Sequence, residues 1–358
     1  MHLKRRLAPL VALGVLLLAA APITHFTVAP YLAKLPSNLD QTTVFDGSMQ
    51  VPDMASGALI ERPIQLERRL KAESVDGDIA VVTLTAELFA SPRTEGAQPL
   101  SREVQRYAVD RTTFEQAAPP TGVQVLDQSS AAVFALPPDF DREGNRLFDA
   151  AARQAVPLTY LSTDSIAGRT AETFRAENTA EVADPDLLTT LRAGVGGLYG
   201  TDGTTVPTAA LAGLGVPADI LAVYGDAAPV TLRVHTIWQA SADRDFGALL
   251  ALDQTVQVDA VVGDTADPIG TITLQKLHVR TAETDIARAG ADLDSNASKF
   301  GLVQWWIPIA AALLGLALIA AAVRRTPPTS AATPAWHDLA TLRPADSDTT
   351  EPEKQAAP

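Results

Sequence analysis

The sequence predicts a mainly β, or α+β, protein whose antiparallel β-sheet domain lies outside the cytoplasm between two transmembrane helices. Three observations lead to this prediction. The chain is apolar near both ends, with basic residues on the outer flank of each apolar segment. Between these segments, apolar and polar residues alternate in runs that end at Asp, Gly or Pro, which is the period of strands with one buried face.

The N-terminal apolar segment follows Lys4, Arg5 and Arg6 and has no charged residue before Lys34. Basic residues stay on the cytoplasmic side of a membrane. Residues 1–6 are therefore expected in the cytoplasm and residues 7–25 as a transmembrane signal anchor. A cleavable signal peptide is the alternative, because the small residues 19–21 resemble a cleavage site. Either outcome exports the middle of the chain.

The C-terminal apolar segment, residues 303–323, has no charged residue, and a helix of this length spans about 30 Å of hydrocarbon. Trp305 and Trp306 lie at its outer end, and Arg324 and Arg325 follow its inner end. Both features orient the helix with its C-terminus inside. The sequence thus predicts a two-pass plasma-membrane protein with an extracytoplasmic domain at 26–302, a disordered tail at 324–358 and both termini in the cytoplasm.

The composition limits the partners of the exported domain. The net charge is -14 and the chain has no cysteine. Acidic surfaces repel nucleic acid, and the lack of cysteine excludes disulfides and thiolate metal sites. No nucleic-acid partner and no cofactor are expected. The expected partners are the lipid bilayer and either an envelope lipid or another envelope protein.

Strands account for most of the predicted domain. Residues 79–89 place Val82, Leu84, Ala86 and Leu88 on one face, and the turn 76–78 joins this run to the preceding one as a hairpin. Short loops between consecutive strands indicate antiparallel pairing. The expected strands are 64–70, 79–89, 104–114, 155–161, 169–177, 230–239, 248–261 and 269–281.

Two stretches have the apolar spacing of helices. Residues 186–193 follow Pro185, with Asp186 as the expected N-cap, and residues 208–223 form the second stretch. The glycine-dense residues 194–203 are expected as a mobile loop between them. No Lys-Ser or Lys-Thr pair follows these glycines, so a phosphate cradle is disfavoured.

A short acidic run near the second membrane segment has some features of a calcium loop. Oxygen-bearing side chains alternate there, but Ala297 and Val303 occupy the positions of the usual glycine and glutamate. A polar cap before the membrane helix is the favoured interpretation. The alternating residues are Asp292, Asp294, Asn296 and Ser298.

No residue pattern indicates catalysis. His235 and His278 fall in predicted strands, where hydrogen-bonded histidines are commoner than metal ligands. The chain lacks the motifs of serine hydrolases, zinc proteases and P-loop proteins. Carboxylates are abundant, but no pair is singled out. We therefore expect a protein that is not an enzyme, with no catalytic, cofactor-binding or metal-binding residue to name.

Several short segments resemble the actinobacterial PorA family, which carries a porin label. They are residues 28–30, 147–149, 156–160, 168–174 and 299–308, and they cover nearly the whole chain in order. The chain departs from the family pattern at residues 150–152, which are alanines where bulkier residues are common. The resemblance implies an envelope protein with an antiparallel β domain and no established catalytic residues.

Several functions remain open at this stage. The favoured one is a non-catalytic domain at the plasma membrane that binds an envelope lipid or interacts with a partner, because a β-rich domain tethered beside a membrane is suited to sheltering an acyl chain. The alternatives are an oligomeric channel, as the porin label implies, and a structural scaffold for envelope assembly. A channel needs several copies, since one chain supplies only two predicted membrane helices.

Overall fold

The computed structural model describes residues 13, 15–19, 34–53, 58–94, 96–138, 140–213 and 215–324. The chain separates into two units, one of residues 22–308 and one of residues 1–21 with 309–358. The first unit holds the β-sheet and is described first. The N-terminal anchor predicted at 7–25 and the predicted tail lie almost entirely outside the described residues.

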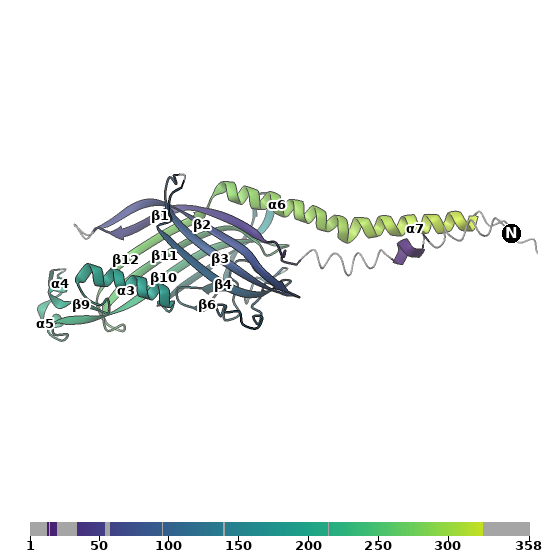
Figure 1. Cartoon of the computed structure of the whole chain (residues 1–358). Coiled ribbons are helices and arrows are strands. Elements are labelled where there is room, and N and C mark those ends of the chain that lie inside the picture. The colour runs from purple at the N-terminus through teal and green to yellow at the C-terminus, as the bar shows by residue number, and fades with distance from the viewer. Residues whose placement is uncertain are drawn as a thin grey trace, which may run out of the picture. The chain divides into compact units, whose positions relative to one another are not determined.

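One antiparallel sheet forms the body of the first unit (Figure 1). Most strands that follow one another in the chain pair with each other, and the first strand, β1, pairs with the last, β12. The strand order is β4-β3-β2-β1-β12-β11-β10-β8-β7. The bounds are β1 (Asp40–Pro52), β2 (Leu59–Asp76), β3 (Ile79–Ala90), β4 (Ser101–Asp110), β7 (Thr159–Ile166), β8 (Arg169–Glu181), β10 (Ala227–Asp243), β11 (Leu249–Gly263) and β12 (Pro268–Thr281).

The structure confirms the antiparallel β class and the hairpin at residues 76–78. Several strand predictions were wrong in their limits, and the run 64–70 covers only part of β2. The run 104–114 extends past the end of β4, and the run 155–161 joins two separate strands, β6 (Gln154–Pro157) and β7. β1 was missed altogether, because its sequence mixes glycine, serine and threonine with few large apolar residues.

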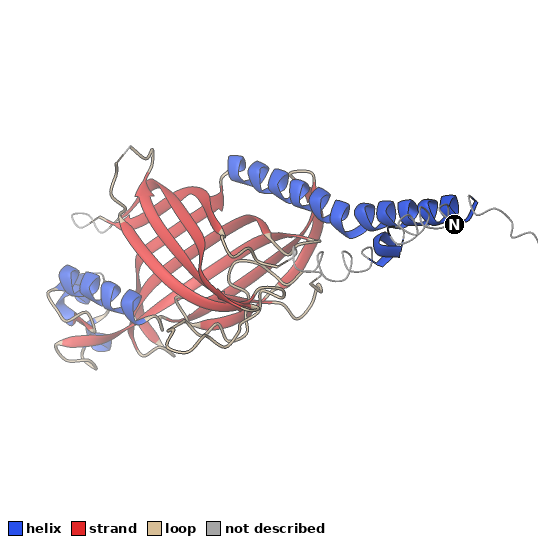
Figure 2. Ribbon diagram, turned by 45° about the vertical axis from the view of Figure 1, so that its right-hand side comes forward, coloured by secondary structure: helices blue, strands red, loops and turns tan. Residues whose placement is uncertain are grey.

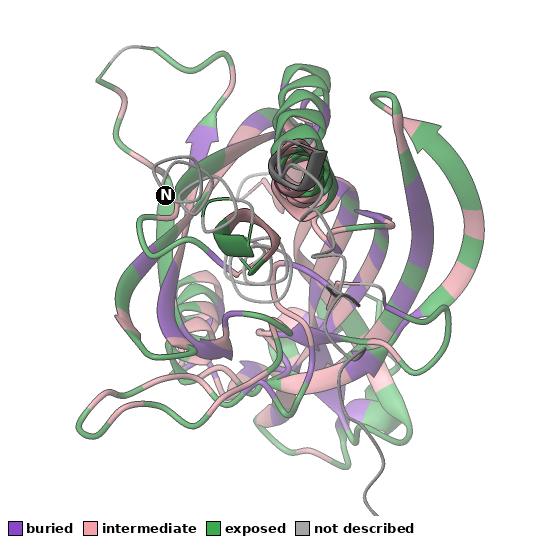
Figure 3. Ribbon diagram, turned by 90° about the vertical axis from the view of Figure 1, so that its right-hand side faces the viewer, coloured by how far each residue is buried: buried purple, intermediate pink, exposed green. Residues whose placement is uncertain are grey.

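Alternation along the strands places a buried set of residues on one face of the sheet (Figure 3). On β10 this face carries Leu232, Val234, Thr236, Trp238 and Ala240. Over one half of it, the connection between β4 and β7, which includes the hairpin β5 (Arg146–Asp149) and β6, supplies the covering apolar side chains. A cavity of only about 10 Å³ remains there, which is at the lower limit for holding one water.

Three helices cover the buried face near the other end of the sheet (Figure 2). They are α3 (Pro185–Tyr199), α4 (Thr208–Gly213) and α5 (Ala218–Leu221), and the short strand β9 (Thr205–Pro207) pairs with β10 between them. The predicted mobile loop at 194–203 was wrong for its first half, because α3 continues to Tyr199. The predicted helix 208–223 is two short helices.

The helix α6 (Glu283–Gly301) is fixed against the sheet by several contacts. Asp285 accepts a hydrogen bond from the backbone N–H of Val44 on β1, and Gly290 packs on Ala167 in the β7–β8 turn. Asp294 forms a 3.2 Å ion pair with Arg169 of β8. The residues considered for a calcium loop, 292–298, are therefore part of a helix and have no loop geometry.

A π-helical turn, η2 (Leu302–Trp306), connects α6 to the apolar helix α7 (Ile307–Arg324). Pro308 explains its position, because proline has no N–H to donate to the carbonyl four residues earlier and its ring crowds that carbonyl. Among the described residues, the helical stretch Glu283–Ala321 is the one that is long and apolar enough to cross a membrane, judged by length and composition only.

Two glycines of α6 allow a matched test of its packing. A Cβ at Gly290 would lie 2.6 Å from the Ala167 Cβ, whereas a Cβ at Gly301 would meet nothing within 4 Å. Both substitutions to alanine raise helix propensity by about 1 kcal/mol, but overpacking costs about 1–3 kcal/mol. We expect Gly290→Ala to lower the melting temperature and Gly301→Ala to leave it unchanged or raise it. Equal melting temperatures would contradict the described packing of α6.

Candidate functional site

A groove of about 400 Å³ lies between α3 and the neighbouring strands β1 and β12. Its volume is within the range of about 300–1,000 Å³ that is typical of small-molecule sites. Most of its lining is apolar. The lining residues, which define what we call the α3 groove, are Pro52, Thr190, Leu191, Ala193, Gly194, Val195, Gly197, Leu198, Leu274 and Gln275.

Local sequence signals fix both ends of α3. Asp184, not the predicted Asp186, is the N-cap, and its carboxylate accepts hydrogen bonds from the backbone N–H groups of Asp186 and Leu187. Pro185 occupies the first turn, where a missing N–H costs nothing. Gly200 ends the helix in the left-handed conformation with φ 69°, which glycine adopts without steric cost.

The glycines inside α3 have two different roles. Gly196 faces the loop that follows the helix, and a Cβ there would lie 2.6 Å from the carbonyl oxygen of Thr201. Gly194 and Gly197 line the groove, and a Cβ at either would meet nothing within 4 Å. Packing therefore requires glycine at 196, whereas glycine at 194 and 197 leaves space open along the groove wall.

The groove is uncharged, and its two polar side chains come from opposite walls. The hydroxyl of Thr190 donates to the carbonyl of Asp186 at 2.9 Å, within the helix. Gln275 pairs in register with Val258, a buried residue of the core on which α3 packs, so its side chain shares that face of the sheet. Within the described part of the chain, the amide of Gln275 has no hydrogen-bond partner.

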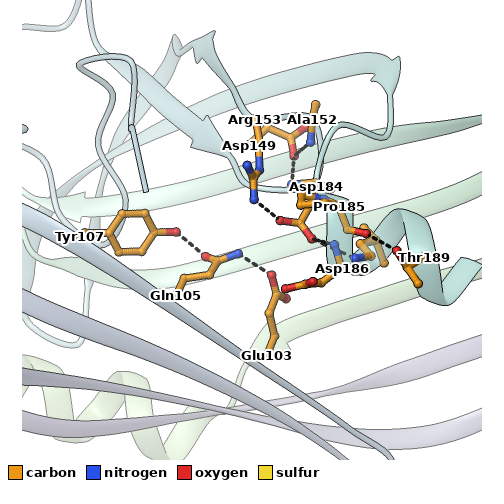
Figure 4. Close-up of polar contacts among 12 residues, drawn as sticks. Glu103, Gln105, Tyr107, Asp149, Ala152, Arg153, Asp184, Pro185, Asp186 and Thr189 are labelled. Atoms are coloured by element: carbon orange, nitrogen blue, oxygen red, sulfur yellow. Dashed lines mark hydrogen bonds and ion pairs between the residues drawn. The ribbon is translucent and has the colours of Figure 1, made fainter. Parts of the chain in front are cut away.

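A cluster of polar side chains lies near the N-terminus of α3 (Figure 4). Glu103, Gln105 and Tyr107 project from the same face of β4, and hydrogen bonds run from Tyr107 to Gln105 and from Gln105 to Glu103. Arg153 forms a 2.9 Å ion pair with Asp184. Desolvation within this cluster, and then the nearby Asp184 carboxylate, raise the pKa of Glu103, although its side chain keeps contact with solvent.

Other buried charges are held by ion pairs that connect strands. Glu172 is almost fully buried and accepts hydrogen bonds from Arg142 at 3.1 Å and Arg244 at 2.7 Å. Asp243 is fully buried and pairs with Arg169 at 2.8 Å. The hydrogen bond that Arg169 donates to the Asp243 carboxylate raises the pKa of Arg169. These contacts join the β7–β8 turn to the end of β10, which is a structural role.

The structure places the two candidate histidines apart, each in a strand as predicted. His235 on β10 contacts Glu177 at 3.1 Å, and His278 on β12 contacts Asp253 at 3.0 Å. In the parts of the chain that the structure describes, no group of three or more His, Cys, Asp and Glu residues has a metal-binding arrangement.

Sequence reasoning missed the α3 groove. Its residues come from positions near 52, 190–198 and 274–275, and no local motif joins segments so far apart. One signal was present: Gly194 and Gly197 are three residues apart, which places them on one face if the segment is helical. Because residues 194–203 were predicted as a loop, this helical spacing of the two glycines was not used.

Comparisons with known proteins give one clear match. A family model described as "Porin PorA" matches residues 8–324. A search of curated proteins gives no match. Solved structures with some similarity include a putative thioesterase II from Thermobifida fusca YX, with 13% identity, a TM-score of 0.14 and coverage of 68% of this chain and 79% of that chain. Another is an N-terminal dehydratase from the difficidin assembly line, with 8% identity, a TM-score of 0.11 and coverage of 75% and 88%. These TM-scores support no conclusion about fold or function.

The raised pKa of Glu103 predicts a pH-dependent effect on stability. The folded state keeps the proton of Glu103 to a higher pH than the unfolded chain does, so the free energy of unfolding falls as the pH rises through the interval between the two pKa values. Because the Glu103 side chain keeps contact with solvent, screening makes the effect small. We expect Glu103→Gln to be slightly more stable than the wild type at pH 7 and equally stable at pH 4. Thermal unfolding at both pH values, with exposed Glu143→Gln as control, tests this expectation. A lower stability of Glu103→Gln at pH 7 would contradict it.

Proposed function

The chain belongs to the porin PorA family, and we propose that its β-sheet domain binds the acyl chain of an envelope lipid in the α3 groove. The observation that carries this proposal is the groove itself, with a volume of about 400 Å³ and a largely apolar lining. Burial of apolar surface contributes about 25 cal/mol per Å². A hydrocarbon chain is the ligand that gains most from such a lining.

The architecture around the groove supports binding. Val195 of α3 packs into the same core cluster as Leu232 of β10 and Val258 of β11, so one wall is held on the rigid sheet. On the same helix, Gly194 and Gly197 leave free space beside the backbone of α3. A site with a fixed wall and open space along it can take up a chain without rearrangement of the core.

We propose binding without catalysis. Among the described residues, the lining of the groove contains no acid, base or cysteine, and the hydroxyl of Thr190 donates to the helix backbone. General acid–base and nucleophilic catalysis need such groups within hydrogen-bond reach of the substrate. Side chains with shifted pKa values lie instead in the charged contacts that join strands. The ion pair of Arg169, whose pKa is raised, with Asp243 is an example.

We also propose that the protein spans the plasma membrane twice, with residues 26–302 outside and both termini in the cytoplasm. The family description and the apolar helical stretch Glu283–Ala321 support a membrane protein. The basic flanks and the tryptophans at 305 and 306 support the orientation. This topology would tether the domain that carries the groove to the membrane.

The family description favours a second candidate, an oligomeric channel. A channel would require several copies whose membrane segments surround one pore, and its polar residues would face that pore. If this candidate is right, the purified full chain produces discrete conductance steps in planar bilayers. A bilayer conductance that stays at its baseline at all protein concentrations would exclude the channel. A structural scaffold remains as the interpretation if neither lipid binding nor conductance is found.

Filling the groove should abolish lipid binding and leave the fold intact. Leucine at Gly194 and Gly197 places its side chains in open space, so we expect the double variant Gly194→Leu/Gly197→Leu to melt at or above the wild-type temperature. We expect native mass spectrometry of the detergent-purified full chain to show a bound lipid in the wild type, and at least a tenfold lower occupancy in the variant.

The matched control is Gly213→Leu in α4. An added Cβ at Gly213 also meets nothing within 4 Å, but Gly213 does not line the groove. Its lipid occupancy should equal that of the wild type. Equal occupancy in all three proteins would assign the bound lipid to the membrane helices and overturn the proposal.

A further inference from the structure

The polar side chain that faces the groove from the sheet is Gln275 of β12. A glutamine amide offers two N–H donors and an oxygen with two lone pairs. Among the described residues this amide has no partner, although Gln275 is half-buried. By contrast, Gln254 on the same face accepts a 2.5 Å hydrogen bond from Arg68. The fold therefore gives the amide oxygen of Gln254 a partner and leaves the amide of Gln275 to the solvent in the groove.

The charge of the lining restricts the ligand further. None of the ten lining residues is Lys, Arg, His, Asp or Glu. An ionised carboxylate or phosphate that entered the groove would lose water without gaining a counter-charge, which is costly. An uncharged ester or hydroxyl would lose less water and could exchange its hydrogen bonds with the amide of Gln275. The lining thus disfavours acidic lipid groups and favours neutral ones.

The dimensions agree with a single chain. The wall that α3 supplies runs from Thr190 to Leu198, which is about 12 Å at 1.5 Å per residue. The cavity volume of about 400 Å³ lies near the lower end of the range of about 300–1,000 Å³ for small-molecule sites, which suits one alkyl chain better than two.

We propose that the α3 groove selects a single-chain acyl ester with an uncharged head, and that Gln275 is the residue that recognises the ester. The chain lies along the wall formed by Gly194 and Gly197, and the amide of Gln275 donates to the ester carbonyl. This inference rests on the proposed lipid-binding function and assigns the chemical class of its ligand.

The test compares two probes of equal chain length, monopalmitoylglycerol and palmitate, added to the delipidated full chain in detergent at pH 8. Native mass spectrometry measures the occupancy of each. We expect the neutral ester to bind at least tenfold more tightly than the carboxylate. We expect Gln275→Leu to bind the ester about tenfold more weakly, which is the effect of about one hydrogen bond, and to lose most of the preference for the ester.

The control variant is Gln239→Leu on β10, an exposed strand glutamine outside the groove. It should retain the wild-type preference. A merely structural effect of Gln275→Leu would weaken the binding of both probes equally. The ratio of the two affinities therefore separates recognition of the ester from an effect on folding.

The outcomes distinguish this inference from the proposed function. If palmitate binds as tightly as the ester, the groove binds lipid but the assignment of a neutral ligand is wrong. If Gln275→Leu retains the full preference, Gln275 does not recognise the ester. If neither probe binds to the wild type, both the proposed function and this inference fail. The same holds if both probes bind to Gly194→Leu/Gly197→Leu as tightly as they bind to the wild type.

Discussion

The pairing of the first strand with the last is the constraint on which the rest of the domain depends. β1 and β12 meet in antiparallel register from Phe45–Thr281 to Gln50–Lys276 and join two groups of consecutive strands into one sheet. The strands approach so closely that a Cβ on Gly47 would lie 2.0 Å from the carbonyl oxygen of His278. The same junction receives the start of α6 through Asp285 and supplies the strand residues of the α3 groove.

This junction also explains why one half of the buried face is filled and the other contains a groove. The long connection between β4 and β7 must return across the sheet, and its apolar residues occupy one half of the face. Near the other end, three helices provide the cover, and of these α3 lies beside the groove. A helix contacts a sheet along a stripe and leaves space beside it unless large side chains fill that space. In α3 the adjoining positions are glycines, so the groove stays open.

The strands and their antiparallel pairing were predictable because alternation is a local signal that the buried face imposes on each strand. β1 was not, since its small and polar residues acquire a buried face only through the contact with β12. α3 was predicted too short because glycine lowers helix propensity by about 1 kcal/mol, while the cap at Asp184 and the packing of Val195 outweigh this cost in the fold. The groove needed the register of distant strands and lay beyond any local pattern.

The polar side chains of the domain fall into two groups with different consequences. Charged residues such as Glu172 and Asp243 are held by arginine partners, because an unpaired buried charge would destabilise the fold by several kcal/mol. Changes at these positions report on stability. Gln275 is only half-buried, so water satisfies its amide in the ligand-free domain at little cost. A polar group of a lipid can replace this water, so that group is expected at Gln275 and the hydrocarbon chain along the glycine wall of α3.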